Sequence, residues 1–477
     1  MPAAVLVDGA DVVDVPGRGC GLVANRAMPA GTCLFTEFPL VAMQHGENAR
    51  SGVIVCEHCF RFLGPLDAQI NALLCGRRAT ARAPEQLPIV PGTDQLPVAV
   101  CCPGGCNLRF CSQACANQNF ASHHRLLCPG GASHCGGAGP LSATPSLPAA
   151  PPGAPPVPPV EPLEESVSAM RELAVDDMQS SSAASESAAA LAADGAAAEA
   201  AKTAASMDDL PTEPLARFAA HARATNEIFS LAAKAAAHVL CRLEESGLPG
   251  YEAAMANFDG PLWWEAVATP DDVTDEVAFR RTLRELLIES WTLLCAVLGP
   301  RAPAECALLA TPAPYAMIVG AFERRNCAVQ VASPVEAYFL AVDAMPEGEA
   351  KANATAVTAP LLDALDVAYS SPCEGTGIFP LQAMLNHSCE PNVTLLKEEG
   401  PEEHDGRVVA RLMRDVAAGE ELCNAYVDIS LPVRRRRREL REYGFECDCP
   451  RCERELAAAN EKKAAKVSRA DGKRRLK

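Results

Sequence analysis

The pattern of apolar and polar residues changes along the chain. Short apolar runs separated by turns occupy the first fifty residues, and those at 12–13, 21–24 and 34–36 predict β-strands. Apolar residues spaced three and four apart come much later, at 216–244 and 276–298, and predict amphipathic helices. The N-terminal part therefore reads as β-structure and the middle of the chain as helical.

Strand patterns return in the C-terminal part. Residues 328–331 and 407–412 alternate or cluster apolar residues as strands do, and 419–428 reads as a turn followed by a strand. An apolar run ends abruptly at Asn386, where the string N-H-S-C-E-P-N precedes a new apolar segment. Such a polar string between two buried segments suits a loop whose side chains face a ligand.

A compositionally different stretch separates these regions. Residues 148–162 are rich in proline, 180–187 in serine and 188–205 in alanine, and no aromatic residue occurs between Phe120 and Phe218. Such a stretch buries too little apolar surface to offset the entropy cost of ordering. We therefore predict a disordered linker at 131–213.

Size and charge narrow the possible functions. The chain has 477 residues, enough for two or three domains, and a formal net charge of −18. The negative charge argues against direct nucleic-acid binding and favours a basic protein partner. Neither a signal peptide nor a membrane-spanning run is recognisable, so no membrane association is expected.

Cysteine is unusually frequent, with 22 residues, and it is clustered. The C-x2-C and C-x3-C spacings with nearby histidines predict zinc sites in a reducing compartment rather than disulfides. The N-terminal ligand candidates are Cys56, Cys59, Cys101 or Cys102, Cys106, Cys111, Cys115, His123 or His124, and Cys128. Eight tetrahedral ligands make two sites. The H-x3-C spacing to Cys128 favours His124 over His123.

A third zinc site is predicted from two distant motifs. Cys447, Cys449 and Cys452 form an incomplete tetrahedral set near the C-terminus, and Cys389 of the N-H-S-C string can supply the fourth ligand. Such a site would hold the C-terminal segment against the loop at Asn386.

These motifs together resemble the SET-and-MYND protein-lysine methyltransferases. The N-H-S-C string, the turn Gly17-Arg18-Gly19-Cys20-Gly21 and the G-E-E-L…Y run ending at Tyr426 match the SET domain. The N-terminal cysteines resemble a MYND finger, whose ligands interleave. The resemblance thus implies one ion on Cys56, Cys59, Cys111 and Cys115, and a second on Cys102, Cys106, one histidine and Cys128.

The resemblance also implies roles for further residues. Tyr426 is expected to be catalytic and Tyr443 to line the lysine channel. The expected ligands of S-adenosylmethionine are Arg18, Cys20, Asn326, Asn386, His387 and Phe445. With the twelve zinc ligands, His124 included, these are the predicted site residues.

Two lengths depart from the family pattern. About forty residues separate Cys59 from Cys101, and about fifty separate Asn326 from Gly377. The first interval is longer than is usual in the family and the second is longer than in animal members, so the layout is closer to plant and algal members. The tryptophans at 263, 264 and 291 are expected in the core, and the arginines at 434–438 on a solvated helix face.

The predicted fold class is α+β: a mostly β SET fold, split by a zinc finger and a helical insert and followed by a cysteine-rich segment. The predicted domains are an N-terminal SET half (1–50), a MYND-type finger (51–130), the linker (131–213), a helical insert (214–345), a C-terminal SET core (346–445), a post-SET zinc segment (446–455) and a basic tail (456–477).

The predicted function is S-adenosylmethionine-dependent methylation of a lysine on a histone or another protein, in nucleus or cytoplasm, by a monomer that carries three zinc ions. The alternative is a catalytically weak or inactive adaptor that binds proline-rich partners through its zinc finger. The substrate, the degree of methylation and the choice between the adjacent ligand candidates stay open at the level of sequence.

Overall fold

A computed structural model describes most of the chain outside the predicted linker. The described residues are 7, 9–91, 93, 96–130, 213–270, 272–302, 306–397, 404–459 and 461. All of them belong to one of the two compact units of the chain, the one formed by residues 1–136 and 186–477. The predicted linker at 131–213, except its last residue, and most of the predicted basic tail lie outside the described residues.

The strands are short, and most lie near the two ends of the chain. They are β1 (Ala10–Val15), β2 (Gly19–Ala24), β3 (Cys33–Glu37), β4 (Val41–Gln44), β5 (Val100–Cys101), β6 (Arg109–Phe110), β7 (Asn326–Val331), β8 (Cys373–Ile378), β9 (Asn386–His387), β10 (Val393–Leu396), β11 (Val408–Leu412) and β12 (Glu421–Asn424).

Helices fill most of the region between these strands. The α-helices are α1 (Gly46–Arg50), α2 (Leu66–Gly76), α3 (Gln113–Asn119), α4 (Arg125–Leu127), α7 (Pro214–Ala224), α8 (Ile228–Ala256), α9 (Trp263–Ala266), α10 (Glu276–Leu298), α11 (Ala307–Ala310), α12 (Pro312–Arg325), α13 (Pro334–Asp343), α14 (Glu349–Leu365) and α15 (Val433–Leu440). Shorter turns of other helix types are η1 (Phe120–His124), η4 (Gly299–Arg301), η5 (Asp366–Ser370), η6 (Gln382–Met384) and η7 (Arg441–Tyr443). No helix within the described ranges is both long and apolar enough to cross a membrane.

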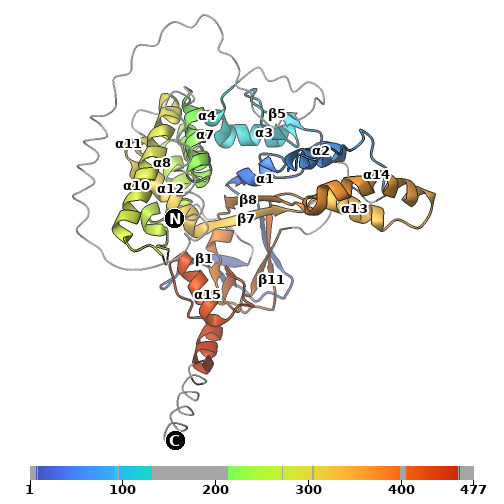
Figure 1. Cartoon of the computed structure of the whole chain (residues 1–477). Helices are drawn as coiled ribbons and strands as arrows, with labels where there is room; N and C mark the ends of the chain where they lie inside the picture. The colour runs from blue at the N-terminus through green and yellow to red at the C-terminus, as the bar shows by residue number, and fades with distance from the viewer. Residues whose placement is uncertain are drawn as a thin grey trace, which may run out of the picture. The chain divides into compact units, whose positions relative to one another are not determined.

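N-terminal strands share sheets with C-terminal strands. One sheet has the order β1-β2-β12-β9, a second β10-β11-β3 and a third β4-β8-β7. β2, β3 and β4 pair antiparallel with β12, β11 and β8 respectively. In Figure 1 the blue N-terminal strands accordingly lie among the orange and red C-terminal ones. The two ends of the sequence therefore build one β-structure.

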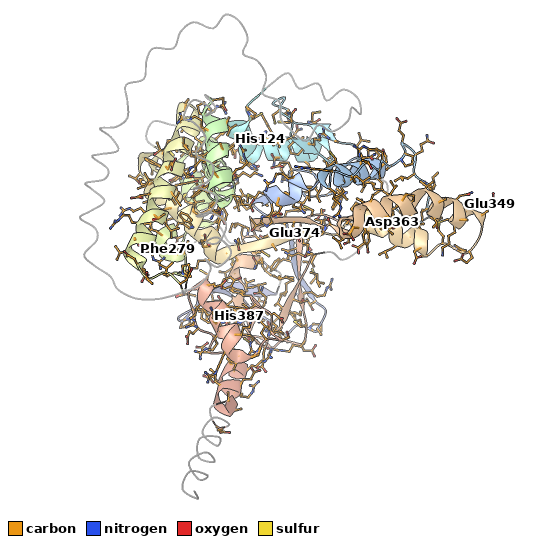
Figure 2. The ribbon with its side chains drawn as sticks, in the orientation of Figure 1. His124, Phe279, Glu349, Asp363, Glu374 and His387 are labelled. Carbon is orange, nitrogen blue, oxygen red and sulfur yellow. The ribbon has the colours of Figure 1, made fainter. Side chains whose placement is uncertain are left out.

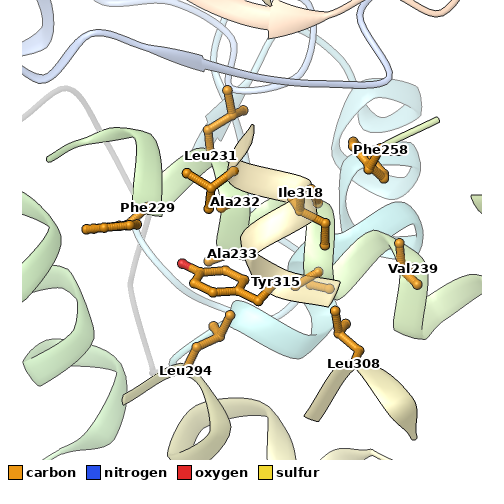
Figure 3. Packing of buried hydrophobic residues seen from close by; sticks show 14 of the residues in the cluster. Phe229, Leu231, Ala232, Ala233, Val239, Phe258, Leu294, Leu308, Tyr315 and Ile318 are labelled. Carbon is orange, nitrogen blue, oxygen red and sulfur yellow. The ribbon is translucent and has the colours of Figure 1, made fainter. Parts of the chain in front are cut away.

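The helices of the insert pack around a large apolar core. Phe229 of α8, Leu294 of α10 and Tyr315 of α12 are buried there, as Figure 3 shows. The Tyr315 hydroxyl is satisfied inside the core by the hydroxyl of Ser290, at 2.9 Å. Trp263 and Trp291 are 3% and 7% exposed, which confirms that they are packing residues.

One predicted helix in this region needs correction. The predicted helix at 216–244 is two helices, since α7 ends at Ala224 and the Asn226 side chain accepts a hydrogen bond from the Ile228 amide at the start of α8. A helical hairpin, α13 and α14, connects β7 to β8, and the predicted domain boundary at 345/346 falls between its two helices (Figure 1). Helix α14 is rich in alanine, so its apolar and polar faces contrast too weakly to mark it. The predicted range 276–298 coincides with α10.

The cysteine-rich region at 51–130 combines two very short strands with α2, α3 and η1. Strands β5 and β6 form a hairpin, and η1 packs against α8. Lys234 of α8 bonds both the Glu57 carboxylate and the Ala42 carbonyl. These contacts fix the cysteine-rich region to the helical insert and to β4. With their helical insert and short sheets, the described residues have mixed helix and sheet content, in agreement with the predicted α+β class.

Candidate active site and cysteine clusters

The polar string at 386–392 is fixed against β12. Strand β9 pairs parallel with β12, which sets Asn386 opposite Cys423. The buried Asn392 side chain accepts from the Cys423 amide at 2.8 Å and donates to the Glu421 carbonyl at 2.8 Å. The oxygen and the nitrogen of the Asn392 side-chain amide are both hydrogen-bonded to β12, so the string is fixed in one position against this strand.

The N-terminal turn meets Asn386 through a shared carboxylate. Glu421 accepts from Arg18 Nη1 at 2.7 Å and from Asn386 Nδ2 at 2.9 Å. Arg18 also donates to the His387 carbonyl. The Cys20 side chain is exposed, but its carbonyl lies 3.4 Å from Asn386 Nδ2. Four predicted site residues, from opposite ends of the chain, are thus in contact.

Tyr426 is held at both its backbone and its hydroxyl. Its amide donates to His387 Nδ1 at 3.0 Å and its hydroxyl donates to the Leu385 carbonyl at 2.7 Å. Burial raises the pKa of this phenol well above its usual value near 10, so the hydroxyl keeps its proton at neutral pH. The side chain therefore presents a fixed, neutral hydroxyl.

Aromatic rings lie next to the Tyr426 ring. The Tyr426 ring centroid lies 5.1 Å from that of Tyr443, 5.4 Å from that of His387 and 6.3 Å from that of Phe445. Tyr443 is tied through its carbonyl to Arg324 Nη1, at 3.0 Å, just before β7. Asn326 is exposed at the start of that strand. Three aromatic side chains from the C-terminal region therefore pack against Tyr426.

The N-terminal cysteines form two groups. In the first, the ligand atoms of Cys56, Cys59, Cys111 and Cys115 lie within 4.8 Å of one another. In the second, those of Cys102, Cys106, His124 and Cys128 do the same. His124 Nε2 is 3.2 Å from Cys106 Sγ, whereas His123 Nδ1 contacts the Ser122 hydroxyl. Cys101 pairs with Arg109 in the β5–β6 hairpin.

The third group unites the two distant C-terminal motifs. The sulfurs of Cys389, Cys447, Cys449 and Cys452 lie within 4.8 Å of one another, and all four residues are buried. Cys389 Sγ is 3.9 Å from Cys447 Sγ and 3.4 Å from Cys452 Sγ. Figure 2 shows His387, next to this group, in a different part of the molecule from His124 of the second group.

All three groups fit a zinc ion. Zinc–sulfur bonds of about 2.3 Å place tetrahedral ligand sulfurs about 3.8 Å apart, close to the separations found here. Burial raises the pKa of the Cys389 thiol to about 11 and that of Cys106 to about 12. Thiolates at these positions therefore require a nearby cation, as a bound metal provides.

Comparison with known proteins gives both a family and relatives. The model of the SET domain matches residues 267–427. The histone-lysine N-methyltransferase ATXR2 of Arabidopsis thaliana is 31% identical, over 93% of this chain and 90% of its own length. The chain belongs to the SET-domain protein-lysine methyltransferases.

Animal members of this methyltransferase family match over shorter stretches. The histone-lysine N-methyltransferase SMYD3 of Mus musculus is 41% identical over 80 residues, 17% of each chain. The protein-lysine N-trimethyltransferase SMYD5 of Homo sapiens is 40% identical over 93 residues, 19% of this chain and 21% of its own. The family resemblance seen in the sequence is thereby confirmed, and with it a protein as the substrate.

The residues of this SET-domain methyltransferase fit S-adenosylmethionine, the methyl donor of the family. Gly17 and Gly19 have φ near +75° and open space where a side chain would lie, so a ligand can approach the backbone there. Arg18 and Asn386 supply polar groups beside this turn. The faces of Tyr426 and Phe445 suit a sulfonium cation and an adenine ring.

Three residues of this site escaped sequence analysis. Glu421 joins Arg18 to Asn386, Arg324 holds the Tyr443 backbone, and Arg436 lies against the third cysteine group. Glu421 is the second glutamate of the G-E-E-L run, so its position within that motif was the available signal.

The prediction that arginines 434–438 form a solvated face is wrong for Arg436, which is 0% exposed. The helical spacing contained the signal, since Val433, Arg436 and Leu440 are three and four residues apart and all face inward.

Proposed function

We propose that this methyltransferase modifies a lysine in a basic segment of another protein, with histones as the first substrates to test. The observation that carries the proposal is the fixed Tyr426 hydroxyl beside the Arg18–Glu421–Asn386 contacts. ATXR2 and SMYD3 are named histone-lysine methyltransferases. The net charge of −18 favours a basic substrate.

S-adenosylmethionine supplies a methyl group on a positively charged sulfur. We propose that Arg18, the Cys20 backbone and Asn386 hold its amino-acid end. His387 would support the position of the loop, Phe445 would stack on adenine, and Asn326 would contact the cofactor from the start of β7. The open space at Gly17 and Gly19 supports this placement.

The lysine side chain reacts as a neutral amine, although its ordinary pKa is near 10.4. An apolar channel lined by Tyr426 and Tyr443 would lower that pKa, because burial and a neighbouring positive charge both disfavour ammonium. The Tyr426 hydroxyl would orient the amine. Correct alignment of two bound reactants contributes roughly 7–11 kcal/mol to such reactions. Water is proposed as the acceptor of the released proton.

The cysteine groups are proposed to bind three zinc ions. The first two would make residues 51–130 a MYND-type finger able to bind proline-rich peptides. The third would make residues 446–455 a post-SET segment that closes the cofactor site, since Cys389 and His387 belong to one string. We propose that the protein acts in the nucleus, the cytoplasm or both, which fluorescence imaging would test, and that it is a monomer, which light scattering would test.

The test is transfer of radioactive methyl from S-adenosylmethionine to histones and to a protein lysate. We expect labelling by the wild type and at least 100-fold slower labelling by Tyr426→Phe, because positioned polar groups of this kind supply such factors. Affinity for S-adenosylmethionine should change less than threefold. Absence of labelling by the wild type, with the cofactor still bound, would instead indicate the adaptor that binds proline-rich partners.

A further inference from the structure

Arg436 is a fully buried arginine whose side chain faces the third cysteine group. Its Nε lies 3.3 Å from Cys389 Sγ and its Nη2 lies 3.5 Å from Cys452 Sγ. Nη1 donates to the Leu431 carbonyl at 2.6 Å, and Nη2 also donates to Glu455 at 2.9 Å. Every nitrogen of the guanidinium group therefore has a partner.

A buried guanidinium requires nearby negative charge, because an unpaired charge in the interior costs several kcal/mol. Glu455 supplies part of it, but this carboxylate is 35% exposed and is shared with Arg451, at 2.7 Å. Four protonated thiols would add no charge. Four thiolates around a divalent ion carry a net charge of −2, which a guanidinium reduces to −1.

We infer that Arg436 is the positioning and charge-balancing residue of the third cysteine group, donating to the thiolates of Cys389 and Cys452 when metal is bound. This inference rests on the zinc part of the proposed function.

The other two groups have different means of limiting their charge. The second contains His124, so a divalent ion there leaves a net charge of −1. In the first, Cys111 and Cys115 are partly exposed, so that water screens the charge. The third has four buried cysteines, and it is there that a buried arginine lies against the sulfurs.

Arginine suits this position better than lysine. Its planar fork reaches two sulfurs, one carbonyl and one carboxylate from a single rigid group. Lysine keeps the positive charge, but all of its hydrogen-bond donors are on a single nitrogen. Arg436→Lys should therefore retain part of the effect, and Arg436→Met, which fills similar volume without charge, should lose it.

The experiment measures zinc content and zinc release to a chromogenic chelator in the full-length protein. The variants are Arg436→Met, Arg436→Lys and, as matched control on the exposed face of α15, Arg435→Met. We expect three zinc ions in the wild type and in the control, with the same release rates. Arg436→Met should release one zinc at least tenfold faster, and Arg436→Lys should lie between.

Two further measurements assign the effect to the third group. In a Cys447→Ser background that zinc is already absent, so Arg436→Met should cause no additional release. With cobalt in place of zinc, Arg436→Lys should shift the sulfur-to-cobalt charge-transfer band, because thiolate hydrogen bonds change the energy of the sulfur electrons.

The outcomes separate this inference from its premise. Wild-type release rates in both Arg436 variants, with three zinc ions bound, would overturn the role of Arg436 alone. Two zinc ions in both the wild type and Cys447→Ser would overturn the third zinc site and the inference together. If Arg436→Met does not fold, the release rate and the cobalt spectrum of Arg436→Lys decide.

Discussion

His387 links the third cysteine group to Tyr426 through the two nitrogens of one ring. Burial, together with the charges of Arg18 and Arg436, lowers the pKa of His387 to about 4, so the ring is neutral at pH 7. Nδ1 accepts from the Tyr426 amide, which leaves the proton on Nε2, 3.3 Å from Cys389 Sγ. The ring orientation is therefore set from both sides.

Glu37 supports the segment whose carbonyl accepts the hydrogen bond from the Tyr426 hydroxyl. At the end of β3, its carboxylate accepts from the amides of Leu381 and Gln382, at 2.8 and 3.0 Å. These residues begin the short turn that ends at Leu385, whose carbonyl receives the Tyr426 hydroxyl. Glu37 thus holds the segment that positions the hydroxyl.

This carboxyl predicts a pH dependence of stability. Burial raises the pKa of Glu37 from 4.5 to about 7. Between these values the folded protein keeps a proton that the unfolded chain has lost, so stability falls as pH rises from about 4.5 to 7. The contribution is about 3 kcal/mol at most. Glu37→Gln should flatten this decrease.

The measurement is urea unfolding at pH 5.5, 6.5 and 8 in zinc-containing buffer. Glu47→Gln, a change at an exposed residue of α1, is the control and should follow the wild type. A Glu37→Gln protein with the same pH slope as the wild type would contradict the assignment.

At the scale of elements, the two unusually long segments of the chain, from Cys59 to Cys101 and from Asn326 to Gly377, pack against each other. Helices α13 and α14, in the interval after Asn326, contact α2, which lies between Cys59 and Cys101. The Tyr338 hydroxyl donates to the Pro88 carbonyl at 3.0 Å, and Tyr338 shares a small core with Val90. Each insertion therefore buries apolar surface of the other.

This packing predicts that damage to one insertion loosens the other. Tyr338→Ala should lower the free energy of unfolding by about 3–5 kcal/mol, as removal of a buried aromatic side chain does, and should speed proteolysis within residues 85–91. Leu340→Ala, at a residue 59% exposed on the same helix, is the control and should change neither quantity. Unchanged proteolysis in Tyr338→Ala would show that the segments are independent.

The elements also show which features of the fold and of the site could be predicted from the sequence. Helix α10 was predictable because its apolar stripe is continuous, whereas α14 was not because alanine occupies both of its faces. The twelve predicted zinc ligands come together in the structure. They were predictable because closely spaced cysteines and histidines are themselves the sequence signal of a zinc site. Glu421 and Arg324 act through partners far away in sequence, so a local pattern such as G-E-E-L can mark a residue but not its partner.

At the scale of the whole molecule, the third cysteine group ties the last described segment to the string at Asn386. Residues 450–459 are helical and carry Cys452 and Arg451, whose guanidinium donates to the Cys389 carbonyl at 3.0 Å. Metal binding and folding of small cysteine-rich segments are coupled. The attachment of residues 450–459 to the string at Asn386 should therefore depend on the zinc ion of the third group.

Cys447→Ser should therefore reduce zinc from three ions to two and weaken binding of S-adenosylmethionine at least tenfold, not only slow turnover. Metal analysis and calorimetric titration measure the two effects. Cys75→Ser, at an exposed thiol outside the three groups, is the control. Normal cofactor affinity in Cys447→Ser would refute the closing role of the third group.

The pairing of β2, β3 and β4 with β12, β11 and β8 has a consequence during synthesis on the ribosome. At roughly 5–20 residues per second, these early strands emerge about 20–80 s before the last of their partners. Through that interval their edges are unpaired and open to association with other nascent chains. A chaperone that occupies the first fifty residues until translation nears its end would protect these edges.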